Sequence, residues 1–252
     1  MQKSFRAKAQ EKVETIIDNG PALVTEMETS LSTLFPMSSL KDAEHEFEQF
    51  LKTASDQNSV PVVPALVIAI PSVREYIATV VTNIRSIEKY ISINFPAIED
   101  GNNFGVSVQL TILKMLKESR ESLVSEIKKL GVTYYETRAN VVDKVGLKNK
   151  SVSTTSATSK SDTTSSIEGE KSGSKSSSST NTEEKESGPS ALDSYRMYHL
   201  LAVEVQAYFD ARNAMSLTID NYCSVLDNVE KNYEKLSAPK GTSGGHSHMG
   251  MF

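Results

Sequence analysis

The sequence holds a single cysteine, no excess of basic side chains and no long uninterrupted hydrophobic run. Because Cys223 has no second cysteine to pair with, a disulfide within the chain is excluded, which fits a reducing compartment. Lysine and arginine total 27 against 32 aspartates and glutamates, and the net charge is −5. Charges of both signs are interspersed along the chain. No basic stripe is therefore available to neutralise a phosphate backbone, and we expect no nucleic-acid partner.

A membrane anchor and a secretion signal are also missing from the sequence pattern. The longest apolar run, residues 60–70, is shorter than the roughly 20 residues of a spanning helix and contains Pro61 and Pro64. No charged-then-apolar leader pattern opens the sequence. We therefore expect a soluble, non-secreted protein with no membrane partner, located in the cytoplasm, the nucleus or both.

A hydrophobic period of 3.5 residues is present in several long stretches. The clearest one runs through Leu66, Ile70, Val73, Ile77, Val80, Ile84, Ile87, Ile91 and Asn94. A strand would alternate polarity at every residue, so this period predicts a helix although many of the side chains are β-branched. Pro71 is expected in the first turn of this helix or at a kink near its start.

Two helices are predicted before this stretch. The first covers residues 3–34 and should kink or briefly break at Gly20-Pro21, because proline lacks a backbone N–H and clashes with the preceding turn. A shorter amphipathic helix over residues 40–51 follows, with Ser38 or Ser39 as its N-cap.

Two long helices are predicted after it, over residues 106–145 and 191–236, and Gly131 should weaken the middle of the former. Their apolar seams are Leu113, Leu116, Arg120, Leu123, Ile127, Leu130, Tyr134, Thr137 and Val141, and then Tyr198, Leu201, Val205, Tyr208, Arg212, Met215, Ile219, Tyr222, Leu226, Val229, Tyr233 and Leu236. Arg212 is expected to reach outward or to pair with a carboxylate, since an unpaired buried charge is costly. Cys223, beside the seam, is expected to be a small core residue.

These patterns predict an all-α fold, an elongated antiparallel four-helix bundle with up, down, up, down topology. This topology places the connection over residues 95–105 at the same end as both termini. A thin rod exposes apolar side surface, and burying it by side-by-side association into a ring is the expected solution. The residues expected to form this second apolar surface are Val81, Met115, Val203, Phe209, Leu217 and Val225.

The chain divides into one folded unit and two polar segments. Residues 1–147 supply the first three bundle helices and the loop 95–105, and residues 189–238 supply the fourth helix of the same domain. Residues 148–188 form a linker that is expected to be disordered, because its 151–187 portion has fourteen serines, seven threonines and only three apolar residues. Residues 239–252 are a Gly/Ser/His-rich flexible tail.

The connection over residues 95–105 is longer than the 2–8 residues that usually join antiparallel helices. Pro96 restricts the backbone, glycines allow sharp turns, and the Asp and Asn side chains favour turn conformations. The residues of interest in it are Glu99, Asp100, Gly101, Asn102, Asn103, Phe104 and Gly105. This loop is the first candidate functional element.

The run Phe95-Pro-Ala-Ile-Glu-Asp-Gly-Asn-Asn-Phe-Gly-Val-Ser-Val-Gln109 closely resembles the activation loop of the 11S regulators, the REG family of proteasome activators. Residues 232–241, residues 211–214 and Leu34-Phe35-Pro36 are also similar to that family. In its better-known members a long low-complexity insert joins the first two helices, whereas here the Ser-rich segment joins the last two.

The resemblance implies a heptameric ring of four-helix bundles that activates the 20S proteasome without ATP. It assigns residues 99–105 as the activation loop that contacts the gate-holding turns of the proteasome α-subunits. It assigns the C-terminal residues Met249, Gly250, Met251 and Phe252 as the tail that enters pockets between α-subunits.

Metal-binding and catalytic sites fit the sequence poorly. A calcium loop starting at Asp100 would place Phe104 and Thr111 where an oxygen ligand and a glutamate are required. His246 and His248 lack further nearby ligands, so no metal or cofactor site is predicted. No catalytic constellation is recognisable, and we expect no enzyme activity. The alternative is an oligomeric helical-bundle scaffold that uses the Ser-rich segment as a tether and has no role at the proteasome.

Overall fold

The computed structural model describes residues 2–55, 60–96, 104–144 and 191–239 of the chain, and in these ranges it contains helices and short connections but no strand. The helices are α1 (Gln2–Leu34), α2 (Leu40–Ser55), α3 (Pro64–Ile93), α4 (Phe104–Lys128), α5 (Tyr134–Lys144) and α6 (Ala191–Ser237). A π-helical segment, η1 (Lys129–Thr133), joins α4 to α5 without a break. The predicted all-α class is confirmed.

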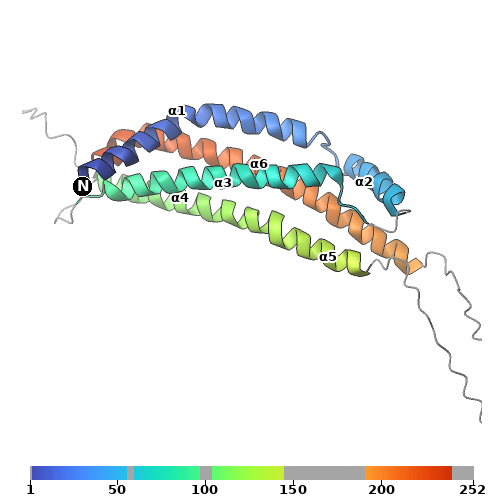
Figure 1. Cartoon of the computed structure of the whole chain (residues 1–252). Coiled ribbons are helices and arrows are strands. Elements are labelled where there is room, and N and C mark those ends of the chain that lie inside the picture. The colour runs from blue at the N-terminus through green and yellow to red at the C-terminus, as the bar shows by residue number, and fades with distance from the viewer. Residues whose placement is uncertain (1, 56–59, 97–103, 145–190, 240–252) are drawn as a thin grey trace, which may run out of the picture.

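Four long helical rods form the predicted elongated bundle, and α2 covers one end of it (Figure 1). Helices α3 and α6 contact each other, and each also contacts both α1 and α4, whereas α1 and α4 do not touch. The central pair is therefore α3 and α6, with α1 and α4 on opposite sides. At 1.5 Å per residue, the 47-residue α6 is about 70 Å long.

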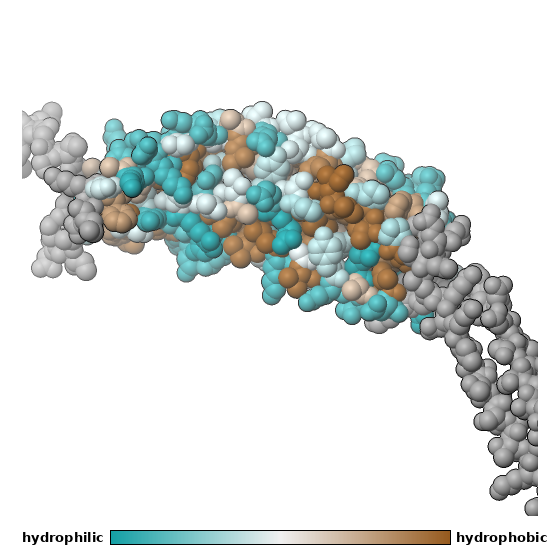
Figure 2. Space-filling view, in the orientation of Figure 1, coloured by the Kyte–Doolittle hydropathy of each residue, from teal (hydrophilic) through white to brown (hydrophobic). Residues whose placement is uncertain are grey.

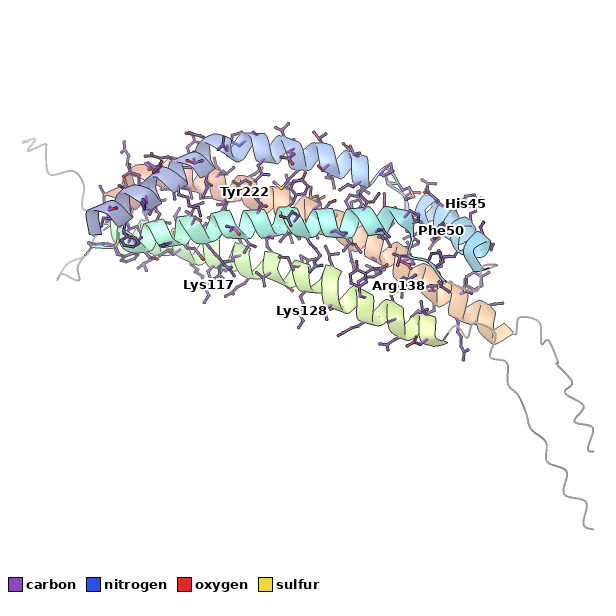
Figure 3. The ribbon with its side chains drawn as sticks, viewed as in Figure 1. His45, Phe50, Lys117, Lys128, Arg138 and Tyr222 are labelled. Atoms are coloured by element: carbon purple, nitrogen blue, oxygen red, sulfur yellow. The ribbon has the colours of Figure 1, made fainter. Side chains whose placement is uncertain are left out.

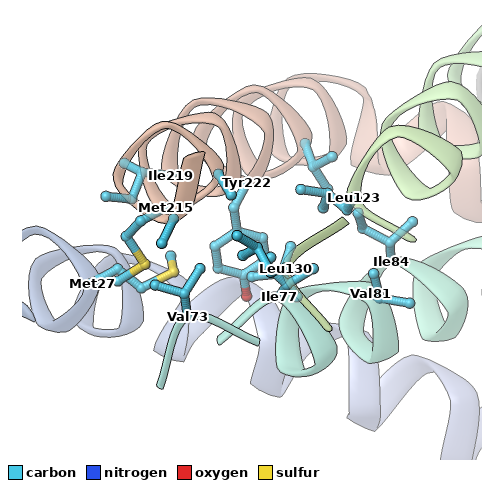
Figure 4. Close-up of a cluster of buried hydrophobic side chains, with 14 of the residues drawn as sticks. Met27, Val73, Ile77, Val81, Ile84, Leu123, Leu130, Met215, Ile219 and Tyr222 are labelled. Atoms are coloured by element: carbon cyan, nitrogen blue, oxygen red, sulfur yellow. The ribbon is translucent and has the colours of Figure 1, made fainter. Parts of the chain in front are cut away.

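The core follows the 3.5-residue period of α3. All eight apolar seam positions predicted for this helix, from Leu66 to Ile91, are fully buried. They pack against side chains from all three other rods, among them Met27, Leu123, Met215 and Tyr222 (Figure 4). Helix α3 is also the one described helix that is long and apolar enough to cross a membrane. Its seam residues are fully buried, which identifies α3 as the core helix of the bundle. A core helix can be as long and as apolar as a helix that crosses a membrane.

Of the predicted kink or brief break at Gly20-Pro21, the break is absent, because α1 continues through both residues, while the helix does change direction along its length (Figure 1). Gly20 is buried against α6, where an added Cβ would lie 2.6 Å from Leu226 Cδ1. The glycine is thus explained by the close approach of two helices and not by a helix end. Pro21 is on the exposed side of α1, and its missing N–H is tolerated there.

Two helix starts have the expected chemistry. The Ser39 hydroxyl accepts a hydrogen bond from the Asp42 backbone N–H at 3.1 Å, so Ser39 caps α2 as one of the two predicted candidates. Pro64, and not Pro71, occupies the first turn of α3. Pro71 lies inside α3 at an exposed position, so its placement in the first turn was wrong.

The weak middle predicted for the third rod is the π-helical segment around Gly131. An added Cβ at Gly131 would lie 3.1 Å from the Arg74 guanidinium. The wider π-helical turn changes which face of the downstream residues is buried. Arg138 therefore turns inward, and Thr137, which was predicted on the seam, is exposed.

Three predictions for the fourth long helix need correction or refinement. Tyr198 is 62% exposed, whereas Leu200 in the same turn of α6 is fully buried against Leu51 and Val141. Cys223 is exposed and is not a core residue. It follows the seam residue Tyr222, and a side chain one position after the seam already faces outward. Arg212 follows the predicted outward path, and its guanidinium reaches the Ser38 carbonyl at 3.5 Å.

The apolar surface expected to drive side-by-side association is largely covered within one chain. Val81 and Val225 are buried, and Met115, Val203, Phe209 and Leu217 are half-buried. Val81 and Val225 are covered within the bundle because α3 and α6 each contact three neighbouring rods and so bury more than one face. The visible face shows separate apolar patches among hydrophilic side chains (Figure 2).

A buried polar network holds the end of the bundle near α2, which we call the distal end. The fully buried Glu204 carboxylate accepts hydrogen bonds from Arg138 Nε at 2.7 Å and from the Tyr134 hydroxyl at 2.6 Å. Arg138 Nη2 also donates to the carbonyls of Val60 and Pro61, both at 3.0 Å. Figure 3 marks Arg138 where α5, α6 and the segment leading into α3 meet. The network therefore fastens three chain segments together.

Candidate functional site

The other end of the bundle, called the proximal end here, contains the start of α1, the end of α3, the start of α4 and the end of α6 (Figure 1). This is the juxtaposition that the up, down, up, down topology predicted. The candidate loop leaves α3 and enters α4 at this end, and the candidate tail leaves α6 beside it.

The exit from α3 is held in place by local and core contacts. The Asn94 backbone N–H donates to the carbonyls of Tyr90 and Ile91 at 3.2 and 3.1 Å, which closes the helix. Phe95 is half-buried and packs against the main hydrophobic core. The loop over residues 95–105 therefore starts from a fixed point.

The other side of the loop differs from the prediction. Phe104 and Gly105, assigned to the loop from the sequence, lie in the first turn of α4, so the helix begins two residues earlier than residue 106. Phe104 is 70% exposed, and the Lys235 ammonium lies 4.6 Å from its ring centroid in a cation–π arrangement. Lys235 is in the last turn of α6. The start of α4 and the end of α6 are thus direct neighbours.

Gly105 makes the tightest of these contacts. A Cβ at this position would lie 2.2 Å from the Pro239 carbonyl oxygen and 2.7 Å from the Pro239 Cα. Distances below 3.0 Å to backbone atoms leave no space for any side chain. Gly105 is therefore required by the close approach of two backbones, and the second backbone is the start of the candidate tail.

Gln109, one turn further along α4, is a functional candidate that the sequence reading did not single out. Its amide Nε2 donates to the Leu236 carbonyl at 3.0 Å, and the whole side chain is buried. A signal was present, because Gln109 lies seven residues before the seam position Leu116. Extending the seam backward by one heptad would have predicted a buried glutamine.

A tyrosine pair supports α6 just before this point. The Tyr90 and Tyr233 rings stack with centroids 6.0 Å apart, and the Tyr233 hydroxyl donates to Glu14 at 3.0 Å. Burial, followed by hydrogen bonding to Tyr90 and Glu14, raises the pKa of the Tyr233 hydroxyl well above its ordinary value. Tyr233 therefore remains a protonated donor and joins α1, α3 and α6.

The remaining predicted site residues lie outside the described part of the chain. These are Glu99, Asp100, Gly101, Asn102 and Asn103 of the loop, and Met249, Gly250, Met251 and Phe252 of the tail. Of the predicted site, the structure therefore describes Phe104 and Gly105, together with the points where loop and tail begin. In the described ranges, no group of three or more His, Cys, Asp or Glu side chains is arranged to hold a metal ion.

Solved structures with this fold are found among proteasome activators. The chain resembles the 11S subunit of the Plasmodium falciparum proteasome, PA28, with a TM-score of 0.61 and 18% identity over 95% of this chain and 92% of that one. It also resembles PA26 from a complex with an archaebacterial 20S proteasome, with a TM-score of 0.58 and 15% identity over 98% and 99% of the two chains.

The sequence comparison agrees with the fold comparison. Residues 59–168 match the family model described as "Proteasome activator PA28, C-terminal". The chain is similar to proteasome activators in both sequence and fold. The resemblance read from residues 95–109 is thereby confirmed, and the matched range contains the whole loop but not the tail.

Curated relatives match this chain over a limited span. Proteasome activator 28 of Dictyostelium discoideum is 41% identical over 66 residues, 26% of this chain. The human proteasome activator complex subunit 3 is 32% identical over 80 residues, 32% of this chain. The matched segments cover 28% and 31% of those relatives' lengths.

Proposed function

We propose that this chain is an ATP-independent activator of the 20S proteasome. It assembles into a heptameric ring, docks on the proteasome α-subunits through Met249 to Phe252 of each tail, and opens the gate with residues 99–105 of each loop. Opening the gate stimulates the hydrolysis of peptides by the proteasome. The activator itself carries out no catalysis and requires no metal or cofactor, and it acts in the cytoplasm, the nucleus or both.

The observation that carries this proposal is the contact between Gly105 and Pro239 at the proximal end. A docking tail and a gate-opening loop must approach the same partner surface together. The backbones from which they emerge touch one another at the end of a rod about 70 Å long. A scaffold of the same topology would share this juxtaposition, but it leaves unexplained why the connection here is longer than the 2–8 residues usual between antiparallel helices.

Physical considerations assign different tasks to the two elements. A short tail with a few apolar side chains binds weakly alone, but several tails on one ring raise the effective concentration and give firm docking. The loop has to push on its partner without yielding, and its two ends are fixed by Phe95 in the core and by Gly105 against Pro239.

This division of labour is tested with two variants and purified 20S proteasome. Deletion of residues 249–252 is expected to abolish association in co-sedimentation, because every tail of the ring is lost at once. Asn102→Tyr is expected to leave association intact while reducing the stimulated cleavage of short fluorogenic peptides. Equal loss of association in both variants would contradict the assignment of docking to the tail and gating to the loop.

The competing proposal is an oligomeric bundle scaffold with a Ser-rich tether. It predicts that neither the full chain nor the variants associate with the 20S proteasome, although the chain still forms oligomers. Measuring the particle mass by light scattering alongside co-sedimentation separates the two proposals and determines the subunit number.

A further inference from the structure

Gln109 occupies an unusual position for a buried amide. The Leu236 carbonyl is among the last four of α6, which have no N–H partner within their own helix. The Gln109 amide supplies that partner at 3.0 Å from a residue 127 positions away in the sequence. The end of α6 is thus capped by a side chain from another helix.

The two polar atoms of the Gln109 amide act in opposite directions on stability. Gln109 is 0% exposed, and its Oε1 atom has no hydrogen-bond partner among the residues that the structure describes. Burying an unsatisfied carbonyl oxygen is unfavourable, whereas an apolar side chain of similar size would leave the Leu236 carbonyl without this donor, so the two costs oppose each other. The hydrogen bond that Gln109 does make selects one position for the end of α6 relative to α4.

Gly105 fixes the same two segments at a second point. Gly105 and Gln109 are four residues apart and lie on one face of α4, where they meet Pro239 and Leu236 respectively. A single contact fixes a position, whereas two contacts one helical turn apart also fix a direction. The end of α6 and Pro239 are therefore held at a defined place and direction beside the start of α4.

From this geometry we propose that Gln109 is a positioning residue that couples the gating loop to the docking tail. The inference rests on the proposed function and adds to it a mechanism by which docking force reaches the loop. When the tails are seated, the Gln109–Leu236 hydrogen bond holds the start of α4 in register with them. The loop then contacts the proteasome at a fixed distance from the docked tails.

The test compares Gln109→Met with Gln206→Met in the full-length chain. Methionine keeps the volume of glutamine but cannot donate, and Gln206 is an exposed glutamine of α6 that bonds only Asp210 in its own helix. For Gln109→Met we expect maximal peptide-hydrolysis stimulation to fall about three- to tenfold, the range for one net hydrogen bond. Its half-saturating concentration should stay within about twofold, because the tail itself is intact. Gln206→Met should match the wild type in both quantities.

Two results would overturn the proposal. One is a maximal stimulation for Gln109→Met equal to that of Gln206→Met. The other is a loss that appears only in the half-saturating concentration, which would make Gln109 a docking residue.

A second measurement does not depend on the proteasome. Amide hydrogen exchange of the isolated protein should become about three- to tenfold faster in Gln109→Met, both at Ser237 and Ala238 and in the first two turns of α4. Gln206→Met should leave these amides unchanged. Faster exchange at only one of the two segments would contradict the coupling. If the wild type fails to stimulate the 20S proteasome while both segments respond together, the proposed function fails and the coupling within the fold stands.

Discussion

Glu204→Ala is expected to lower the free energy of unfolding by about 3–5 kcal/mol, the range for removing one partner of a buried ion pair. The substitution leaves the Arg138 guanidinium, whose side chain is only 12% exposed, without its carboxylate. It also leaves the Tyr134 hydroxyl without an acceptor. Burial and the hydrogen bond to Glu204 raise the pKa of Tyr134 well above its ordinary value, so this hydroxyl stays a protonated donor. Urea denaturation followed by circular dichroism at one fixed protein concentration measures the change.

Two controls make the Glu204 result specific. Asp227→Ala removes the exposed partner of Lys231 and should change the free energy of unfolding by no more than about 1 kcal/mol. The double variant Glu204→Leu with Arg138→Leu should be less destabilised than Glu204→Ala, because no unpaired charge remains. If Glu204→Ala were as mild as Asp227→Ala, the network would not hold the distal end together.

Gly105→Val is expected to separate the end of α6 from the start of α4 and to reduce stimulation of the 20S proteasome at least about tenfold. The nearest atoms to an added Cβ belong to the Pro239 backbone, so a rotamer change cannot relieve the clash. Forcing extra atoms into a packed site typically costs about 1–3 kcal/mol, which is enough to shift most molecules to a displaced arrangement. Peptide hydrolysis by the 20S proteasome at saturating activator measures the loss.

Gly131→Ala is the matched control for Gly105. Its added Cβ would meet the Arg74 guanidinium at 3.1 Å, and a flexible side-chain tip can move aside. Gly131 is buried, but its neighbour can shift by a few tenths of an ångström, so we expect stimulation within about twofold of the wild type. Full stimulation by Gly105→Val would show that the contact with Pro239 is not needed to position the loop.

Much of the fold follows from the sequence because its core is periodic. The eight seam residues of α3 all proved fully buried, since a sustained 3.5-residue repeat identifies the side of a helix that faces the core. The bundle topology then followed because successive long helices alternate in direction. It correctly placed the start of α4 beside the end of α6.

The errors came from contacts between residues far apart in the sequence. Gly20-Pro21 has the appearance of a helix break, yet Gly20 serves the packing of α1 against Leu226 of α6. Thr137 was placed on the seam because a constant period ignores the π-helical segment around Gly131. Local patterns contain no information on such pairings.

The candidate site was predictable in its location but not in its supports. The loop could be identified from its length and its turn residues. Its resemblance to proteasome activators is confirmed by the match over residues 59–168. The roles of Gln109, Lys235 and Pro239 appear only when α4 and α6 lie side by side.

The central claim is that this chain opens the 20S proteasome gate. The most direct measurement titrates the purified full-length protein into purified 20S proteasome without ATP and follows the cleavage of a short fluorogenic peptide. We expect a saturable rise in the cleavage rate that disappears when residues 249–252 are deleted. A cleavage rate that stays at the basal level across the whole concentration range, with the chain correctly folded, would contradict it.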